Sequence, residues 1–481
     1  MPHHNDAARP QASEQPPRGP PTLPPRAPPP RREKSGARAE ALHPPLSPGK
    51  ALEAGSSPLR KTRVHSNRRE PTSLELIPQF FFPEGKPPTR EEMQTADKSK
   101  EEAFAKHPGG LPADAFAEMA KAVLQLPTCV GYLLFDRLAP SPADAVTAEA
   151  WDAWVERTGV RGMDRVHRLF QALKKEGSPG ITMSDLEPLV RAVINKHPGL
   201  EFLKDTPEFQ DRYQETVVYR IFYHVNRSDT GSITLKELRA GDLLDALQHL
   251  DEEEDINKVL RFFSYEHFYV VYCKFWELDQ DHDFMIDRED LLRYGNHALT
   301  YRIVDRIFDQ VPRRFKCSVP GKMGYEDFCW FIFSEEDKST DVALSYWFRC
   351  VDLDCDGVIR PDEMLFFYEE QVSRMESLIH EPVLFEDILC QLCDMLHPKH
   401  EGVFTMRDLK SERHLAGILF NCLFNINKFV AFETRDPFLA RQSEDGSDLT
   451  PWDRFASAEY IRLALEEEDP AAGGEDEFDK F

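Results

Sequence analysis

The sequence lacks a long hydrophobic run. Although 41% of its 481 residues are hydrophobic, no apolar stretch approaches the roughly 18 to 20 residues that a membrane-spanning helix needs. The N-terminal 30 residues are rich in proline and basic residues and contain no apolar core of the kind that a secretory signal has. We therefore predict a chain without a membrane partner that stays inside the cell, in the nucleus, the cytoplasm or both.

The cysteines lack the spacing of a disulfide framework. Nine of them, an odd number, are scattered between Cys129 and Cys422, so we expect reduced thiols and no structural disulfide. Common catalytic motifs are missing as well: the P-loop, the Gly-x-Ser-x-Gly elbow, the His-Glu-x-x-His zinc motif and the His-Arg-Asp loop of kinases. We predict that the chain is not an enzyme.

Positive charge is scarce outside the N-terminal segment. The formal net charge is −25, yet residues 1–70 carry 13 Lys and Arg against 6 Asp and Glu, which leaves −32 for the rest of the chain. An acidic body does not offer the basic face that binds nucleic-acid phosphates, so we predict no nucleic-acid partner. Such a body suits cations or basic proteins better.

Residues 1–70 are also poor in large apolar residues and hold 15 of the 37 prolines. This composition cannot bury enough surface to fold, which predicts a disordered tail. Residues 21–26 have the pattern of a polyproline ligand, although a plain linker explains them as well. Ser47 and Ser57, each followed by proline, resemble sites of proline-directed kinases, where a phosphate would offset the basic charge.

Three consecutive aromatic residues follow this tail. Phe80, Phe81 and Phe82 lie between Pro78 and Pro83, and proline keeps the residue before it extended, so the segment is not a helix. Such a segment either packs into the core or forms an exposed anchor for another protein. The residues alone leave both interpretations open.

The clearest motif is an EF-hand calcium loop. Asp352, Asp354, Asp356 and Glu363 provide carboxylates at loop positions 1, 3, 5 and 12, and glycine stands at position 6. Ca²⁺ binds about six to eight oxygen atoms. Three Asp side chains, both oxygens of Glu363 and the carbonyl of Val358 supply six of them, and water completes the shell. We predict a calcium site in this loop.

A second loop has the same carboxylate spacing but departs from the pattern twice. Its predicted ligands are Asp279, Asp281, Asp283, the carbonyl of Met285, Asp287 and Asp290. Phe284 replaces the glycine at position 6, where a positive φ costs a non-glycine residue about 1 kcal/mol or more. Asp290 replaces the usual glutamate, and its shorter side chain favours weaker binding or the smaller Mg²⁺. The alternative is a loop kept only for structure.

The apolar residues that flank these loops recur along the chain. The same frame appears near residues 174, 226, 316 and 397, without enough carboxylates to bind a metal. Isolated EF-hands leave one side of their helices uncovered, so they fold in pairs. The order predicts three pairs: 174 with 226, 279 with 316, and 352 with 397. We predict a mainly α fold, an elongated array of paired EF-hand-like helix–loop–helix units with a disordered N-terminal tail.

One group of residues imitates a zinc site. Cys390, Cys393, His397 and His400 have zinc-binding side chains, but a Cys₂His₂ finger places about a dozen residues between its Cys and His pairs. The apolar spacing through residues 385–396 predicts one amphipathic helix. Cys393 takes a position that is aromatic in the two acidic hands, which predicts a buried thiol and no zinc.

The order of these motifs resembles the B'' (B-double-prime) family of regulatory subunits of protein phosphatase 2A. The resemblance rests on the aromatic segment 77–83, the glycine-free loop from Asp279 and the conventional loop from Asp352, and it covers roughly residues 71–435. It implies a non-catalytic subunit that docks on the HEAT-repeat scaffold subunit and next to the catalytic subunit. Such a subunit directs the holoenzyme to phosphoprotein substrates under the influence of calcium.

The resemblance also implies roles for individual residues. Ile77, Phe80, Phe81, Phe82 and Pro83 would form the hydrophobic motif that faces the scaffold, which favours a partner anchor over core packing. The ligands of both loops carry over, so we expect Ca²⁺ at two sites, constitutive in the second loop and tunable in the first. Two alternative functions stay open: an EF-hand calcium sensor or adaptor that recruits a different partner, and an EF-hand enzyme whose catalytic module has none of the common motifs.

These observations divide the chain into five segments. They are residues 1–70, the disordered tail; 71–126, the docking motif and first helices; 127–250, an EF-like helical domain with degenerate loops; 251–435, the EF-hand domain with two calcium-competent loops; and 436–481, a C-terminal helix and acidic tail. The C-terminal helix is expected to start at Thr450 and Pro451, where a capping residue precedes proline.

Overall fold

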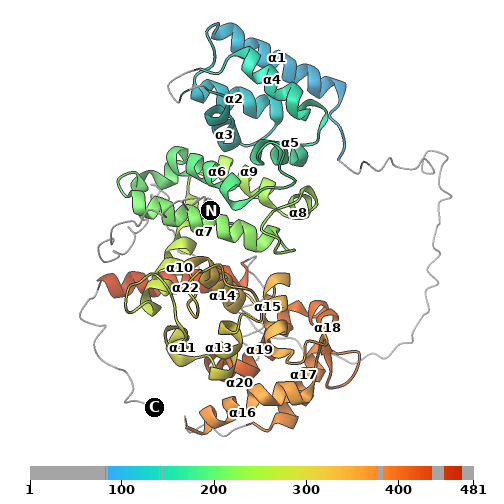
Figure 1. The fold of residues 1–481 in the computed structure, drawn as a ribbon, viewed down its shortest axis with the longest axis vertical. Helices are drawn as coiled ribbons and strands as arrows, with labels where there is room; N and C mark the ends of the chain where they lie inside the picture. The colour runs from blue at the N-terminus through green and yellow to red at the C-terminus, as the bar shows by residue number, and fades with distance from the viewer. Residues whose placement is uncertain are drawn as a thin grey trace, which may run out of the picture.

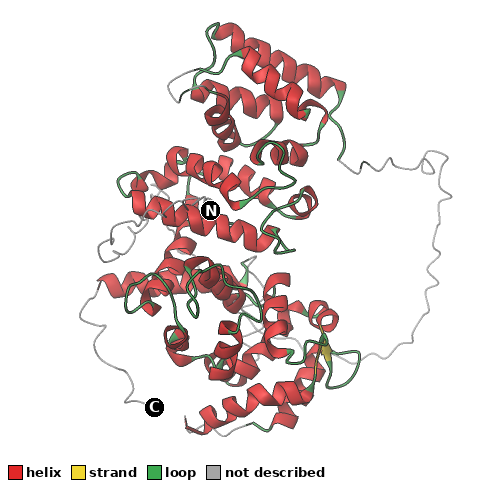
Figure 2. Ribbon diagram, in the orientation of Figure 1, coloured by secondary structure: helices red, strands yellow, loops and turns green. Residues whose placement is uncertain are grey.

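The chain folds into helices that stack along one long axis. A computed structural model describes Phe82 and residues 85–139, 141, 145–377, 383–435 and 449–468. These residues are almost entirely helical, with two short strands (Figures 1 and 2). The predicted mainly α fold is therefore confirmed. None of the helices in this part of the chain is long and apolar enough to cross a membrane.

The N-terminal half forms the upper part of Figure 1. Its helices are α1 (Arg90–Lys106), α2 (Ala113–Leu124), α3 (Thr128–Leu138), α4 (Ala148–Thr158), α5 (Arg165–Leu173), α6 (Met183–Lys196), α7 (Pro207–Val225), α8 (Leu235–Ala240) and α9 (Leu243–Glu252). Three short 3₁₀ helices connect them: η1 (Val160–Gly162), η2 (Pro198–Leu203) and η3 (Ile256–Lys258).

The C-terminal half lies below α7. Its helices are α10 (Tyr265–Leu278), α11 (Arg288–Leu292), α12 (Tyr294–His297), α13 (Tyr301–Phe308), α14 (Tyr325–Glu336), α15 (Asp341–Val351), α16 (Pro361–Ser377), α17 (Phe385–Leu396), α18 (Met406–Ser411), α19 (Arg413–Phe424), α20 (Ile426–Glu433) and α22 (Pro451–Glu468). The strands are β1 (Val358–Ile359) and β2 (Phe404–Thr405), which pair antiparallel.

Short antiparallel bridges join the loops in pairs. They link Ile181 with Ile233, Ile286 with Met323, and β1 with β2. The bridging side chains are apolar and fully buried, apart from those at the outer ends of the two strands. These bridges confirm the three predicted pairs, because each joins one loop to the loop expected beside it.

A fourth pair, which the sequence frame did not reveal, lies in α1 to α4. Leu111, between α1 and α2, forms an antiparallel bridge with Val146, before α4. Neither loop has the acidic spacing of an EF-hand, so a search for metal ligands passes over them. The bridge joins residues on both sides of position 126. We therefore propose to move the first domain boundary to the end of α4.

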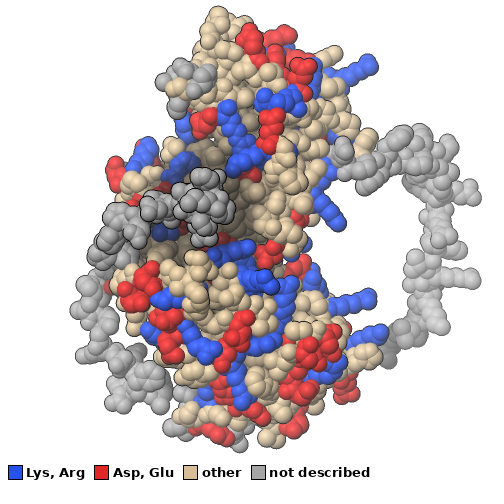
Figure 3. All heavy atoms as spheres, in the orientation of Figure 1, with Lys and Arg blue, Asp and Glu red and all other residues tan. Residues whose placement is uncertain are grey.

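The two halves meet along α7. The hydroxyls of Thr216 on α7 and Tyr325 on α14 lie 2.7 Å apart, and those of Tyr223 and Ser334 lie 3.1 Å apart. All four residues are buried. Lys and Arg side chains gather on the surface at this level, between α7 and α15 (Figure 3).

Helix α22 closes the C-terminal half. Its start is capped as predicted, because the Thr450 side chain accepts the N–H of Asp453 at 3.1 Å and the Asp453 side chain accepts the N–H of Thr450 at 2.9 Å. Trp452 packs its ring perpendicular to Phe333, 5.0 Å away, and donates its Nε1–H to the ring of His267. The helix reaches Glu468, so it includes the first residues expected in the acidic tail.

Trp452 should be the main anchor of α22. We expect Trp452→Ala to lower the free energy of unfolding by roughly 3 kcal/mol, because it removes a large side chain that is only 6% exposed. Urea unfolding followed by circular dichroism measures this change. The matched control is Leu465→Ala on the same helix, where the side chain is 61% exposed. Equal effects of the two substitutions would contradict the role of Trp452.

Candidate metal centres

The loop between α15 and α16 gathers three carboxylates. Oxygens of Asp352, Asp354 and Asp356 all lie within 4.8 Å of one another. The Asp352 carboxylate is buried; one oxygen accepts the N–H of Gly357 at 3.0 Å and the other accepts the N–H of Asp356 at 3.2 Å. Gly357 has φ +86°, a conformation that glycine adopts without strain.

Glu363 closes this loop from the first turn of α16. One oxygen accepts the N–H of Leu353 at 2.6 Å and the other accepts the N–H of Arg360 at 2.9 Å. The two oxygens of Glu363 therefore bond to N–H groups near the two ends of the loop, at Leu353 and Arg360. The Arg360 guanidinium lies 2.5 Å from Asp356 and 3.8 Å from Asp354, so it partly neutralises the acidic group. Val358, whose carbonyl is the sixth predicted ligand, begins β1.

The loop between α10 and α11 has nearly the same geometry. Oxygens of Asp279, Asp281 and Asp283 lie within 4.8 Å of one another. Asp279 accepts the N–H of Phe284 at 2.9 Å, as Asp352 does for its glycine. Burial, with a smaller contribution from the neighbouring carboxylates, raises the pKa of Asp279 to about 6. In the absence of a cation this carboxyl therefore keeps its proton to a higher pH than an exposed aspartate.

The end of this loop differs from that of the second loop. Asp290 and Asp287 cap each other, since each side chain accepts the other's N–H at 2.9 Å. The second oxygen of Asp290 pairs with Arg293 at 3.0 Å. Glu363 reaches back across its loop to Leu353, whereas the described hydrogen bonds of Asp290 stay within α11 and its two cap residues. This supports the expectation of weaker metal binding, which remains a prediction.

Phe284 has a role that sequence reasoning missed. Its φ is +62°, as the loop position requires, and its ring lies 4.9 Å from the ring of Phe275 and 5.7 Å from that of Tyr325. The guanidinium of Arg212 on α7 lies 3.9 Å from the Phe284 ring centre, a close cation–π contact. The residue that costs backbone strain thus connects the loop to the N-terminal half. The aromatic residue at a position where EF-hand loops have glycine was the sequence signal that could have indicated this role.

Lys322 was also missed. It comes from the sister loop of the same pair, where its ammonium contacts Asp283 and lies 3.8 Å from Asp281. It precedes Met323, the residue that bridges to Ile286. The two loops of this pair are therefore joined by charge as well as by the bridge, and a bound cation must compete with the lysine.

The loop that begins at Asn226 shows how one hand dispenses with a metal. The side-chain oxygen of Asn226 accepts the N–H of Gly231 at 3.0 Å, which fixes the amide. Its Nδ2 lies 3.0 Å from the carbonyl of Ser232, 3.2 Å from Glu237, and 3.3 Å from the hydroxyls of Ser228 and Thr230. These four residues hold loop positions 3, 5, 7 and 12, so an N–H donor takes the place of the cation.

The imitation zinc site does not assemble. Among the described residues, the acidic groups of the two loops are those whose ligand atoms converge enough to hold a metal. The thiol of Cys393 accepts the N–H of Gly402 at 3.2 Å, and burial raises its pKa. Cys393 is half-buried, not fully buried as expected, because it lies at the edge of α17 against its own loop.

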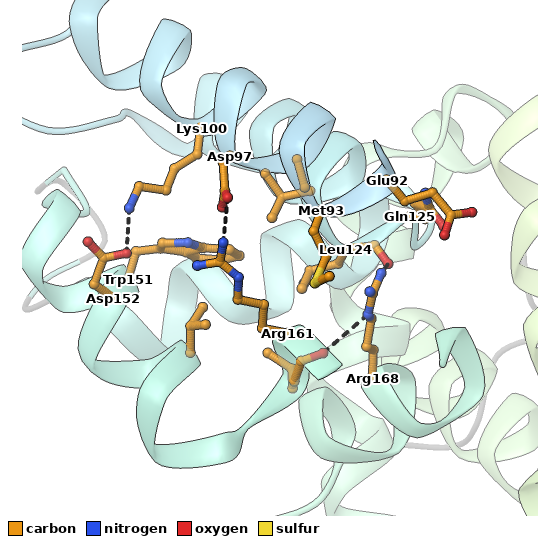
Figure 4. A pocket seen from close by; sticks show the side chains of 14 residues that line it. Glu92, Met93, Asp97, Lys100, Leu124, Gln125, Trp151, Asp152, Arg161 and Arg168 are labelled. Carbon is orange, nitrogen blue, oxygen red and sulfur yellow. Dashed lines mark hydrogen bonds and ion pairs between the residues drawn. The ribbon is translucent and has the colours of Figure 1, made fainter. Parts of the chain in front are cut away.

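A small cavity of about 60 Å³ lies between α1, α4 and η1 (Figure 4). Its charged rim is paired internally, with Lys100 and Asp152 2.6 Å apart and Arg161 in contact with Asp97. Arg168 donates to the carbonyls of Val160 and Leu124. The two ion pairs join α1 to α4 and to η1 across the cavity.

The predicted docking and modification residues lie mostly outside the described part of the chain. This applies to Ile77, Phe80, Phe81, Pro83, Ser47 and Ser57, to the tail 1–70 and to residues 469–481. Phe82 is described, and its side chain is 42% exposed.

Comparisons with known proteins agree with this loop geometry. Models described as an EF-hand domain and an EF-hand domain pair match residues 164–253 and 268–369. A relative in Arabidopsis thaliana, named as the probable B''epsilon regulatory subunit of serine/threonine protein phosphatase 2A, is 49% identical over 88% of this chain and 81% of its own. The chain belongs to the B'' family of protein phosphatase 2A regulatory subunits.

Other similar proteins extend this family assignment. The beta member of the B'' regulatory subunits of Homo sapiens is 39% identical over 89% of this chain and 78% of its own length. A solved structure described as a PP2A PR70 holoenzyme, with "diCa" in its description, contains a chain that is 47% identical. It matches with a TM-score of 0.51 and covers 56% of this chain and 98% of that chain.

The Asn226 loop should be convertible into a calcium site. We expect Asn226→Asp to add one bound Ca²⁺ per chain, because a carboxylate keeps the Gly231 contact and turns an oxygen toward Ser232 and Glu237. Isothermal titration of the full chain measures the stoichiometry. Asn226→Leu is the matched control, since it removes the amide without adding a ligand. The same stoichiometry in both variants would contradict this explanation of the loop.

Proposed function

We propose that this chain is a non-catalytic, calcium-binding regulatory subunit that docks on the scaffold and catalytic subunits of protein phosphatase 2A. The observation that carries the proposal is the similarity to B'' regulatory subunits over most of the chain, together with two acidic loops in an EF-hand domain pair. The relatives are named regulatory subunits, which supports a role without catalysis. In that role the chain directs the holoenzyme to phosphoprotein substrates, in the cytoplasm, the nucleus or both.

We further propose different duties for the two loops. The loop from Asp352 suits constitutive Ca²⁺, because Gly357 takes its positive φ without strain and Glu363 turns both oxygens into the loop. The loop from Asp279 suits a weaker, tunable site. There Phe284 takes the positive φ at a cost, and the short side chain of Asp290 bonds to Asp287 and Arg293 and does not reach across the loop, which suits Mg²⁺ as well as Ca²⁺.

Through the contact between Phe284 and Arg212, calcium binding in the first loop would affect the N-terminal half. A cation in the first loop would fix the backbone at Phe284, whose ring holds the Arg212 side chain of α7. The Tyr325 ring next to Phe284 also meets α7, through its hydroxyl and that of Thr216. Calcium would therefore stiffen the junction of the two halves and change the affinity for other subunits, as linkage requires.

The aromatic segment 77–83 is the proposed contact with the scaffold. Phe82 exposes 42% of its side chain, more than core packing would leave. Large exposed aromatics are typical anchors of protein interfaces. In this proposal, Ile77, Phe80, Phe81 and Pro83 dock together with Phe82.

Calcium should control assembly with the phosphatase subunits. We expect EGTA, or Asp279→Ala combined with Asp281→Ala, to reduce recovery of purified scaffold and catalytic subunits on the tagged full chain by about fivefold or more. Quantitative co-purification with and without Ca²⁺ measures this loss. Glu187→Ala combined with Glu254→Ala is the matched control, because it removes two exposed carboxylates away from both loops.

Two outcomes would contradict parts of this proposal. Unchanged recovery of the phosphatase subunits after chelation would show that assembly does not depend on calcium. Full retention of the phosphatase subunits by Phe80→Ala with Phe81→Ala would argue against the docking motif. If the unchanged chain binds neither of the phosphatase subunits, the alternative of a calcium adaptor for another partner would take its place.

A further inference from the structure

A basic groove lies at the junction of the two halves. A cavity of about 600 Å³ opens between the C-terminal end of α7 and the first turns of α15, α19 and α22. A smaller cavity of about 190 Å³ adjoins it, and the two share Tyr223, Arg227, Asp341 and Val342. In Figure 3, Lys and Arg side chains gather at this level of the surface.

Three cations in this groove share one carboxylate. Asp341 lies 3.5 Å from Arg227, 3.4 Å from Lys410 and 3.1 Å from Arg413. The cations come from three separate places in the chain: the loop after α7, α18 and the start of α19. Because one negative charge faces three positive ones, this cluster has an excess of two positive charges in an otherwise acidic body. A phosphate monoester carries about the opposite charge at neutral pH.

The remaining groups around the groove reduce this excess to about one positive charge but do not cancel it. Arg261 and Lys258 line it and pair with Asp242 and Glu253 at 2.6 and 3.5 Å. The acids Asp337 and Asp453 also line it and bring two negative charges: Asp337 accepts from Ser339, and Asp453 caps α22. Arg220 lines the groove as well and offsets one of them. Tyr223 and three histidines, His224, His249 and His414, are the other titratable groups in the lining.

Helix geometry adds to the positive potential. The first turns of α15, α19 and α22 contribute Asp341, Arg413 and Trp452 to the groove lining. Helix N-termini carry a partial positive charge, which favours anions such as phosphate. The side chains of Thr340 and Thr450 already accept one N–H each from α15 and α22, so the helix dipole is the contribution that remains. Arginine forks add bidentate donors of matching geometry. Cations and helix termini therefore converge on one hollow that is large enough for a peptide side chain.

We propose that this groove binds a phosphorylated serine or threonine of a substrate protein, held by Arg227, Lys410 and Arg413. The phosphate would replace Asp341 as the shared partner of these three side chains. This inference rests on the proposed function, because phosphoproteins are the substrates of a phosphatase holoenzyme. A phosphate enclosed by three cations acts as a docking group, so the groove would select substrates that carry a second phosphorylated residue for dephosphorylation.

The test uses the full chain without other subunits, so that it does not depend on assembly. Fluorescence anisotropy measures binding of a short degenerate peptide pool with a fixed central phosphothreonine, beside the same pool with threonine. We expect about tenfold tighter binding of the phosphorylated pool, and loss of this preference in Arg227→Gln combined with Arg413→Gln. The preference should also weaken as salt rises.

The matched control is Lys236→Gln combined with Arg314→Gln, which removes the same charge from exposed positions outside the groove. Equal binding of the two pools would overturn the proposal. Equal losses of the preference in the groove variant and in the control variant would also overturn it. The same holds if heparin displaces the phosphorylated pool equally well from both variants. Either result indicates a general attraction of polyanions. Failure here with intact assembly on the phosphatase subunits would leave the proposed function standing.

Discussion

One hydrogen bond recurs in every predicted EF-hand loop and does not need a metal. The carboxylate at loop position 12 accepts the N–H at position 9, which starts the following helix. The acceptors are Asp185, Glu237, Asp290, Asp327, Glu363 and Asp408, at 2.8 to 3.3 Å. This bond satisfies an N–H that the helix cannot satisfy itself. With the apolar bridge at position 8, it keeps each pair of loops together whether or not calcium is bound.

Because the frame is independent of metal, individual loops have been free to diverge. Asn226 fills its loop with an amide, and Phe284 uses the position-6 slot to reach Arg212 on α7. The loop from Asp352 departs least from the EF-hand pattern. The described loops thus include one that is closed by its own amide, one that keeps the EF-hand carboxylates and one that contacts the other half of the chain.

Spacing explains what could be predicted from the sequence. The three loop pairs and the start of α22 follow from short local patterns, namely a central apolar residue, a capping pair and flanking apolar residues. The pair at Leu111 and Val146 could not be predicted, because it retains the bridge but none of the acidic spacing. The contacts of Phe284, Lys322 and Asn226 also depend on neighbours that a linear pattern does not show. The sequence shows that Phe284 departs from the EF-hand pattern, but only the packing shows that its ring contacts Arg212.

We propose that Phe284 transmits calcium binding to the rest of the chain. The most direct test measures the affinity of the Phe284→Gly chain for the purified complex of scaffold and catalytic subunits, with Ca²⁺ and with EGTA. Glycine relieves the positive φ but removes the ring that holds Arg212. Calcium should then bind the first loop more tightly while the calcium dependence of assembly largely disappears. A calcium response equal to that of the unchanged chain would contradict the account.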